Sequence, residues 1–303
     1  MMNVLEAYKV SKTYDGKNWA LLDFTLTIKQ GELLSLLGRN GAGKTTFINI
    51  ATTQLRQTRG TVRVLGYDVI KEAKSVRRLI AIVPQEARPL SLATPWEHVY
   101  YYLLARGLSI NEARERTARY LREMDLWECR NVISSKLSGG LRQRILVAMA
   151  IATEAEMIFL DEPTIGLDPI GKMNVWRYIG QYAKKGCTFV LTTQDMEEAE
   201  ILSDRVAVMD RGILIAYGDL QSLKSRVKSK IRMEIKGNVS EEKLREYGSV
   251  INLTDKLLLY TDEKFADEVA KLAMTNNCQV TISPIRLEDV FISLVGVGPH
   301  EEA

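Results

Sequence analysis

The sequence predicts an α/β protein with a parallel-sheet core, an antiparallel β subdomain, a helical insertion and a small α+β domain near the C-terminus. Apolar strand-like segments alternate with helical ones as far as residue 217, which is the pattern of a parallel sheet with crossover connections. Between residues 94 and 152 the pattern is helical. Beyond Asp219 the segments are shorter and follow the order β-α-β-β-α-β, which is typical of a ferredoxin-like domain.

The N-terminal segment predicts the antiparallel β subdomain. Residues 3–36 contain two or three short strand-like stretches separated by polar residues. Phe24, Leu26 and Ile28 alternate with polar neighbours, as in a strand with one buried face. The apolar stretch ELLSLL at the end of this segment predicts the first strand of the parallel core.

The remaining core elements follow in order along the chain. Residues 61–69 and 80–85 predict strands, and the second of these ends at Pro84 and Gln85. The helical insertion is expected at about residues 87–150, with two or three helices. The segments MIFLDEP and CTFVLTTQ then predict two further strands, separated by a helix at about residues 171–185.

Residues 38–45 have the sequence GRNGAGKT and fit the phosphate-loop pattern G-x-x-x-x-G-K-[ST]. The loop follows an apolar strand and precedes a predicted helix, which is the context that the pattern requires. Its glycines allow backbone N–H groups to surround phosphate oxygens, Lys44 can reach the β and γ phosphates, and the Thr45 hydroxyl can bind Mg²⁺. The sequence therefore predicts a nucleoside polyphosphate as ligand.

Two acidic residues, Asp161 and Glu162, come directly after an apolar strand downstream of this loop. A carboxylate at the first position can bind Mg²⁺, and one at the second can polarise the water that attacks a γ-phosphate. An acidic pair at a strand end is by itself a weak signal, because many such pairs only face solvent. The phosphate loop upstream favours the catalytic interpretation.

Residues 137–144, with the sequence LSGGLRQR, predict the start of an apolar helix. Ser138 is a good N-cap, and Gly139 and Gly140 leave backbone N–H groups open to an anion at the helix start. Without further context this is an ordinary capped helix after a loop. Together with the phosphate loop, the Pro84–Gln85 turn and LDEPTIGLD, it forms a set of motifs that chance does not explain.

Composition limits the other possibilities. The chain has 303 residues, of which 46% are hydrophobic and 26% charged, with a net charge of +3. No basic stripe is evident, so no nucleic-acid partner is expected. Cys129, Cys187 and Cys278 lack C-x-x-C spacing, so neither a disulfide framework nor a zinc site is expected and a reducing cytoplasmic location fits best. The longest apolar run, at residues 145–152, is too short to span a bilayer, so other chains would supply any membrane spans.

The C-terminal region begins with charges at every second position between Lys224 and Lys236. This alternation predicts a strand whose charged face is solvated and whose other face, with Ile231, Met233 and Ile235, points into a core. An RNA or anionic-lipid surface is the alternative interpretation of the same basic pattern. The solvated strand face is favoured, because it needs no partner.

The phosphate loop, the Pro84–Gln85 turn, LSGGLRQR and LDEPTIGLD together resemble the motifs of the ATP-binding cassette (ABC) ATPases over about residues 3–217. The resemblance implies a RecA-like core, ATP and Mg²⁺ as cofactors, and ATP hydrolysis. It implies a nucleotide-binding domain at residues 1–219 and an accessory domain at residues 220–303. It also implies a dimer, because the family binds two nucleotides between the Walker A loop of one subunit and the signature of the other.

The resemblance assigns roles to individual residues of this chain. Gln85 would be the Q-loop residue that senses the metal and the attacking water, and Glu162 would be the catalytic carboxylate. Mg²⁺ would be held by Thr45, Gln85 and Asp161. Nucleotide would be contacted by Tyr14, stacked on adenine, by the Walker A residues Gly38, Arg39, Asn40, Gly41, Ala42, Gly43, Lys44, Thr45 and Thr46, and, from the opposing subunit, by Ser138, Gly139, Gly140 and Asp168. A core tyrosine is the alternative interpretation of Tyr14.

One position departs from the family pattern. The family's switch histidine is expected after the strand CTFVLTT, where this sequence has Gln194. Neither His98 nor His300 lies where it could substitute. A glutamine amide can donate a hydrogen bond to a γ-phosphate, but it cannot be protonated. We therefore expect Gln194 to act at the site with slower hydrolysis, or the chain to be one half of an asymmetric heterodimer.

Within the family, LSGGLRQR and the segment LEDVFISLVG at residues 287–296 resemble the ATP-binding subunits of multidrug or daunorubicin-type exporters. This implies a second cassette, identical or different, and separate membrane-spanning permease subunits as partners. The chain would then lie in the cytoplasm, on the inner face of the cell membrane. The start of the helical insertion, with Trp96 and Tyr100 to Tyr102, would meet the permease, although these aromatics suit ordinary helix packing equally well. The rival reading is a soluble ABC ATPase that acts as an ATP-driven clamp in a non-transport process.

Overall fold

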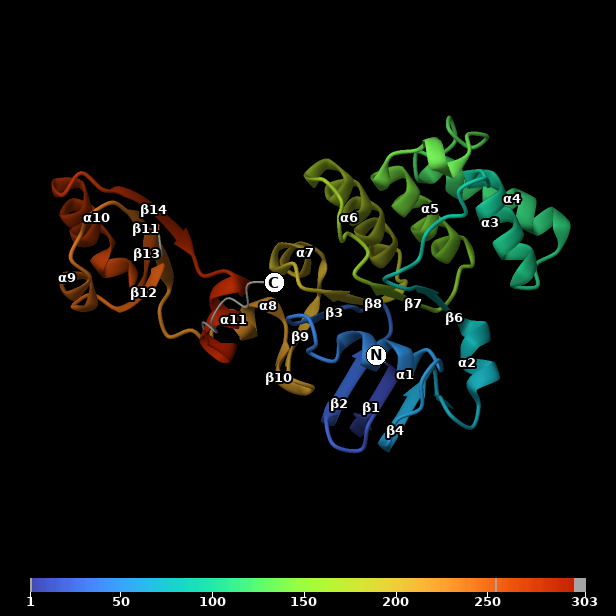
Figure 1. Ribbon diagram of the computed structural model, residues 1–303, viewed down its shortest axis with the longest axis horizontal. Helices are drawn as coiled ribbons and strands as arrows, with labels where there is room; N and C mark the ends of the chain where they lie inside the picture. Colours follow the sequence, from blue (N-terminus) through green and yellow to red (C-terminus); the bar gives the residue numbers. More distant parts are fainter. Residues whose placement is uncertain (1, 254, 297–303) are drawn as a thin grey trace. The chain divides into compact units, whose positions relative to one another are not determined.

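The computed structural model describes residues 2–253 and 255–296, which form two compact units. The first unit ends at Asp219, and the second begins at Leu220 (Figure 1). Each unit has buried apolar clusters of its own. Within the described residues, none of the helices combines the length and the apolar character that crossing a bilayer requires.

The N-terminal strands form an antiparallel sheet in the first unit, in the order β2-β1-β4-β5. The long partners are β1 (Asn3–Thr13) and β2 (Trp19–Lys29), and the sheet is completed by β4 (Arg59–Val64) and β5 (Tyr67–Asp68). In β2, Phe24, Leu26 and Ile28 are buried while their neighbours are exposed, as the period of two predicts. The predicted antiparallel β subdomain is thus present.

The central sheet has six strands in the order β10-β9-β3-β8-β7-β6. All neighbours pair in parallel except the edge hairpin of β9 and β10. The strands read as continuous apolar runs because helices or other strands cover both faces of the sheet. Their bounds are Leu33–Leu37 (β3), Ile80–Val83 (β6), Met157–Asp161 (β7), Thr188–Thr193 (β8), Arg205–Asp210 (β9) and Ile213–Gly218 (β10).

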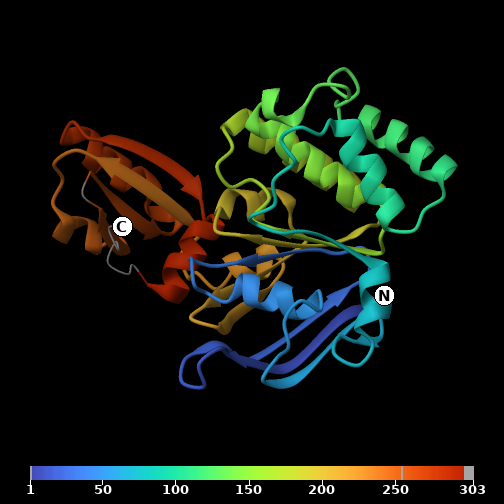
Figure 2. The same cartoon turned by 45° about the vertical axis from the view of Figure 1, so that its right-hand side comes forward.

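Alternate residues of the central strands belong to two separate cores. In β7, Ile158 and Leu160 join the core beneath the helical insertion. Met157 and Phe159 join the core shared with the antiparallel sheet and with α1 (Lys44–Ala51). Figures 1 and 2 show this layering, with the helical insertion on one side of the central sheet and α1 with the antiparallel sheet on the other. The predicted α/β fold class is confirmed, since the structure has this mixed architecture.

The helical region contains three α-helices and a short 3-10 turn at Ser134–Lys136. The first helix begins with a capping box, in which Thr94 and Glu97 satisfy each other's backbone N–H groups. The remaining helices of the first unit lie between the core strands, and α2 is one that the sequence patterns did not reveal. The bounds are Ala73–Leu79 (α2), Pro95–Ala105 (α3), Ile110–Glu123 (α4), Gly139–Ala152 (α5), Pro169–Lys184 (α6) and Met196–Leu202 (α7).

The second unit contains an antiparallel sheet in the order β12-β13-β11-β14. Its elements follow the sequence β-α-β-β-α-β, with a core between the sheet and two helices, α9 and α10. Two further helices, α8 and α11, flank this repeat in the chain. The bounds are Leu220–Lys224 (α8), Ile231–Lys236 (β11), Glu241–Arg245 (α9), Ser249–Leu253 (β12), Lys256–Thr261 (β13), Glu263–Phe265 (a 3-10 turn), Ala266–Thr275 (α10), Gln279–Pro284 (β14) and Leu287–Val295 (α11).

The expectation of a strand over residues 224–236 was right in that Ile231, Met233 and Ile235 point into a core, but wrong in its extent and in its solvated charged face. The strand β11 begins only at Ile231, and the chain up to Lys224 forms a helix. On the charged face of β11, Arg232 is only 4% exposed. A single sequence pattern could not reveal this, because the residues that cover Arg232 come from α11, far along the chain.

Arg232 anchors α11 to the sheet of the second unit. Its Nη1 donates to Asp289 Oδ1 at 3.1 Å and to Glu288 Oε2 at 3.0 Å, and its Nη2 pairs with Glu234. The Tyr260 hydroxyl donates to the same Asp289 oxygen at 2.9 Å. Although burial acts against the charged form, these carboxylates raise the pKa of Arg232 above its usual value, so the guanidinium stays charged.

We predict that Asp289→Ala selectively destabilises the second unit. Removing one partner of a buried ion pair costs about 3–5 kcal/mol, because the remaining charge stays buried and is left short of partners. Hydrogen exchange of β11 in the intact chain should therefore accelerate strongly. The control is Glu241→Ala, which removes the surface Glu241–Arg245 pair and a hydrogen bond from Asn252 and should cost about 1 kcal/mol or less. Equal protection of β11 in both variants would contradict the anchoring role of Arg232.

Candidate nucleotide-binding site

The phosphate loop connects β3 to α1 and packs closely against neighbouring backbone. Gly43 caps α1 with a φ of 96°, a conformation that favours glycine. A Cβ at Gly43 would lie 2.4 Å from the Ala20 carbonyl oxygen, and one at Gly38 would lie 2.5 Å from that of Met209. Glycine is therefore required at both positions by contact as well as by motif. The loop is fixed from both sides, by β2 and by β9.

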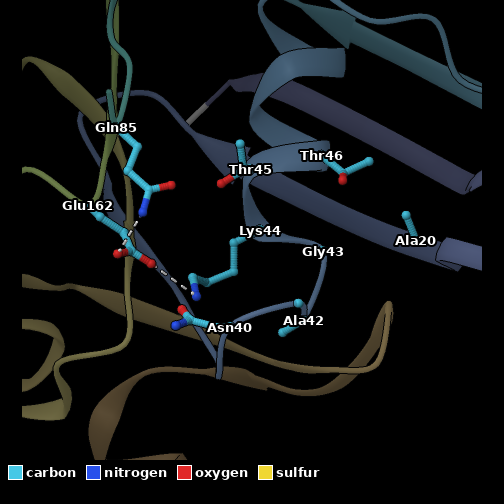
Figure 3. A pocket seen from close by; sticks show the side chains of 10 residues that line it. Ala20, Asn40, Ala42, Gly43, Lys44, Thr45, Thr46, Gln85 and Glu162 are labelled. Atoms are coloured by element: carbon cyan, nitrogen blue, oxygen red, sulfur yellow. Dashed lines mark hydrogen bonds and ion pairs between the residues drawn. The ribbon is translucent and has the colours of Figure 1, made fainter. Parts of the chain in front are cut away.

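Lys44 is the buried cation of the site, with 5% of its surface exposed. Its Nζ donates to the Gly38 carbonyl at 2.7 Å and to the Arg39 carbonyl at 3.2 Å. It also forms an ion pair with Glu162 Oε1 at 3.4 Å (Figure 3). The ammonium thus lies inside the curve of the loop, where the phosphates of a nucleotide would need a positive charge.

The acidic pair lies where β7 ends. Asp161 Oδ1 accepts a hydrogen bond from Thr45 Oγ1 at 3.2 Å and a short one from the Thr192 hydroxyl. Glu162 has a left-handed φ of 48°, and its backbone N–H donates to Thr192 Oγ1 at 2.9 Å. This turn directs the Glu162 side chain to Lys44 and to Gln85, whose Nε2 donates to Glu162 Oε2 at 3.2 Å. Three segments far apart in the sequence therefore meet at one carboxylate.

A cavity of about 400 Å³ opens above the loop. The residue types around it suit a polyphosphate with a hard divalent cation, since they combine backbone N–H groups at a helix start, one buried ammonium and oxygen donors. Thr45 and Asp161 lie together, joined by a hydrogen bond, and their side-chain oxygens are of the kind that Mg²⁺ prefers. The residues that line the cavity are Ala20, Asn40, Gly41, Ala42, Gly43, Lys44, Thr45, Thr46, Gln85 and Glu162.

The structure brings most of the expected nucleotide-contacting residues of one subunit to this cavity, but it places Tyr14 at the rim. The Tyr14 side chain is 65% exposed, and its hydroxyl lies 3.2 Å from Thr46 Oγ1. This exposure contradicts the alternative of a core tyrosine. The ring is exposed, and Lys12 Nζ lies over it at 5.1 Å from its centroid.

The residues expected to act on the opposing subunit lie at two helix starts away from the cavity. Ser138 caps α5 by accepting from the Leu141 N–H at 3.3 Å, and Asp168 caps α6 by accepting from the Gly171 N–H at 2.6 Å. The two starts are close, because a Cβ at Gly140 would lie 3.4 Å from the Gly171 Cα. Gly139, which begins α5, lies in the same place.

Gln194 lies between β8 and α7 with an exposed side chain, and it is not among the cavity-lining residues described. His98 is buried in the helical region, where its Nε2 accepts from the Leu90 N–H at 2.7 Å. It therefore does not substitute for the switch residue. His300 lies outside the described residues.

Two residues of the site were missed by sequence reasoning. Ala20 lines the cavity from β2. The hydroxyl of Thr192, in β8, donates to the Asp161 carboxylate and accepts from the Glu162 backbone N–H. Ala20 gives no chemical signal in a sequence. Thr192 could have been found, because a hydroxyl near the carboxyl end of a parallel strand lies at the sheet edge where ligands bind.

The fold and this site define a phosphate-loop nucleotide-binding protein of the ABC ATPase class. The model of the ABC transporter family matches residues 21–165. A relative from Streptomyces peucetius, the "Daunorubicin/doxorubicin resistance ATP-binding protein DrrA", is 37% identical over 75% of this chain and 68% of its own length. The chain belongs to the ABC transporter family.

Other relatives and solved structures agree with this family. The "Doxorubicin resistance ATP-binding protein DrrA" of Mycobacterium tuberculosis is 38% identical over 72% of this chain, and the match spans 66% of that relative, slightly less than two thirds. A solved "ATP binding subunit of ABC transporter" superposes with a TM-score of 0.66 at 28% identity, covering 74% of this chain and 92% of that one. A dimeric, post-hydrolysis ATP-binding cassette bound to ADP and Pi gives a TM-score of 0.64 at 28% identity, covering 71% and 98%.

We predict that Gly43→Ala disables the loop. The left-handed backbone costs a non-glycine residue about 1–2 kcal/mol. Overlap with the Ala20 carbonyl adds about 1–3 kcal/mol, because backbone cannot move aside easily. The first unit should melt at a lower temperature and bind ATP at least tenfold more weakly, as measured by thermal unfolding and calorimetry.

The matched control is Gly41→Ala. Gly41 also has a positive φ, of 78°, but a Cβ there meets no atom within 4 Å. It should therefore show only the backbone cost. If the two variants were equally stable and bound ATP equally well, close packing at Gly43 would not matter.

Proposed function

We propose that this chain binds and hydrolyses ATP as the cytoplasmic ATP-binding subunit of a membrane exporter. The observation that carries the proposal is the buried Lys44, held by loop carbonyls and Glu162 at the mouth of a polar cavity. A buried cation at the start of a helix, within a glycine-rich loop, suits a polyphosphate, and a carboxylate beside it suits activation of water. Membership of the ABC transporter family supports the same reaction.

The residues of the site divide the work of hydrolysis. When ATP binds, the Lys44 ammonium leaves Glu162 and the loop carbonyls and contacts the β and γ phosphates instead. Glu162, released from Lys44, accepts the proton of the attacking water, and Gln85 orients that water. Thr45 and Asp161, with Gln85 beside them, would hold Mg²⁺. When bound, that ion neutralises charge on the phosphate oxygens.

Two copies, or this chain and a second cassette, would complete each site. Ser138, Gly139, Gly140 and Asp168 lie at two adjacent helix starts, away from the phosphate loop of their own subunit. The backbone N–H groups of Gly139 and Gly140, beside the Ser138 hydroxyl at the start of α5, suit an anion that arrives from outside. The dimeric form of the similar post-hydrolysis cassette supports this arrangement. We propose that Tyr14 stacks on adenine and that Gln194 contacts the γ-phosphate in the closed dimer.

The helical insertion would transmit the closing and opening of the dimer to the permease subunits. Leu90, Leu92 and Tyr101 are 72%, 82% and 62% exposed near its start, so an apolar surface is available beside Gln85 and α3. The insertion is also tied to α6 of the core, since the Tyr182 hydroxyl donates to Glu123 Oε2 at 2.5 Å. Burial, together with this carboxylate, raises the pKa of Tyr182, so the hydroxyl remains a donor at all ordinary pH values.

The direction of transport follows from the relatives by analogy. Several relatives are named for resistance to doxorubicin or daunorubicin, which is consistent with export. We propose that the membrane subunits select the cargo and that this chain, on the inner face of the membrane, supplies energy. The binding free energy of two ATP molecules would favour the closed dimer, and hydrolysis would release it.

We predict a steady-state ATPase rate per chain that rises with protein concentration and is lost in Glu162→Gln. The rise is expected because each site needs a second subunit, and the loss because an amide cannot accept the proton. The variant should still bind ATP by calorimetry. A wild-type rate no higher than that of Glu162→Gln at every concentration would contradict the proposed hydrolysis by the isolated chain.

We predict that Gln194→His raises turnover several-fold with little change in ATP affinity. Imidazole combines a hydrogen bond to the γ-phosphate with a protonatable nitrogen, which an amide lacks. Gln194→Ala is the matched control, and it should lower turnover below that of the wild type. A histidine variant no faster than the wild type would show that the amide does not limit the rate.

A further inference from the structure

Glu198 is a buried carboxyl group close to the nucleotide site. It lies in the first turn of α7 and is 1% exposed. Its Oε1 accepts from Thr164 Oγ1 at 2.8 Å and from Trp176 Nε1 at 2.8 Å. Both donors are neutral. A buried carboxyl group with neutral partners is costly to maintain, so packing alone gives no reason to have it there.

The two hydrogen-bond donors to Glu198 come from the turn after Glu162 and from α6. Thr164 lies two residues after Glu162, Trp176 lies in the middle of α6, and Thr193 ends β8 directly before Gln194. Burial raises the pKa of Glu198, although hydrogen bonds from Thr193, Thr164 and Trp176 oppose this change. Glu198 therefore ties α7, which begins two residues after Gln194, to the turn after Glu162 and to α6.

A second contact holds the start of α7, on the C-terminal side of Gln194. Asp195 caps α7 by accepting from the N–H groups of Glu197 and Glu198 at 3.1 and 3.2 Å. Its other oxygen accepts from Lys172 Nζ at 2.6 Å, and Lys172 lies one turn into α6. Gln194 is thus the exposed residue between two anchored neighbours, Thr193 and Asp195. Its backbone position depends on both anchors.

We propose that Glu198 is a positioning residue that fixes Gln194 relative to Glu162. It joins residues 193–195, which we call the switch segment, to the turn after Glu162 and to α6. These parts therefore move as one body when a second subunit closes. This inference rests on the proposed function, because it concerns the same hydrolytic site. A purely structural carboxyl group would affect the stability of α7 without selectively affecting Gln194.

The kinetic test compares Glu198→Leu with Glu198→Gln. The leucine variant removes the acceptors, whereas the glutamine variant keeps one amide oxygen that Thr164 and Trp176 can still reach. We expect kcat to fall about 10- to 100-fold in Glu198→Leu, the range expected for misplacement of a reacting group by about 1 Å. The KM for ATP should change less than twofold, and Glu198→Gln should recover most of the rate. Equal rates in all three proteins, or losses in the leucine variant that the glutamine variant does not reverse, would overturn the proposal.

A second readout does not depend on hydrolysis. A nitroxide spin label is attached at Gln194→Cys, or at Ile201→Cys as control, after Cys129, Cys187 and Cys278 have been replaced by alanine. Ile201 is 57% exposed on α7, so a label there reports the helix itself. We expect the label at position 194 to become more mobile in Glu198→Leu and to regain its wild-type mobility in Glu198→Gln. The mobility of the label at position 201 should stay unchanged.

The two readouts separate failure of the inference from failure of the proposed function. Unchanged mobility at position 194, or an equal rise at positions 194 and 201, would overturn the positioning role whether or not ATP is hydrolysed. If the wild-type rate equals that of Glu162→Gln but the label at position 194 responds as expected, hydrolysis by the isolated chain fails and the positioning role stands.

Discussion

The buried ammonium of Lys44 is the interaction on which the rest of the site depends. It lies in a cradle of backbone carbonyls and contacts Glu162, so it connects the phosphate loop with the end of β7. A buried charge persists only where partners surround it, and here those partners come from two different strand ends. The ammonium therefore joins the place where phosphate binds to the group that would activate water. Gln85 reaches the same carboxylate from a third segment.

The layered arrangement of the first unit brings the phosphate loop, the end of β7 and Gln85 together. Parallel strands place their carboxyl ends at one edge, where β3, β7 and β8 deliver the phosphate loop, the acidic pair and the switch segment. Alternate residues of each strand enter two different cores, so the strands are fixed from both faces. The helices capped by Ser138 and Asp168 begin away from the phosphate loop of the same chain. In our account, a second subunit is therefore needed to bring such helix starts to the nucleotide.

Local patterns predicted much of the fold and of the phosphate site. The loop at residues 38–45 and the pair Asp161–Glu162 are defined by spacing within a few residues, so the sequence alone could indicate them. Arg232 was misjudged because its partner Asp289 is distant in the sequence. Ala20 lines the cavity through its backbone position. The role of Glu198 depends on contacts with Thr164 and Trp176, which no local pattern encodes.

The central claim is that Lys44 is held in place for the phosphates of ATP. Calorimetric titration of Mg-ATP into the wild-type chain and into Lys44→Met tests it most directly, because methionine keeps the packing but removes the charge. Our account predicts binding of one ATP per chain and a loss of affinity of at least about tenfold in the variant, since a charged hydrogen bond contributes about 1.5–3 kcal/mol. Equal affinity in the two proteins would contradict it.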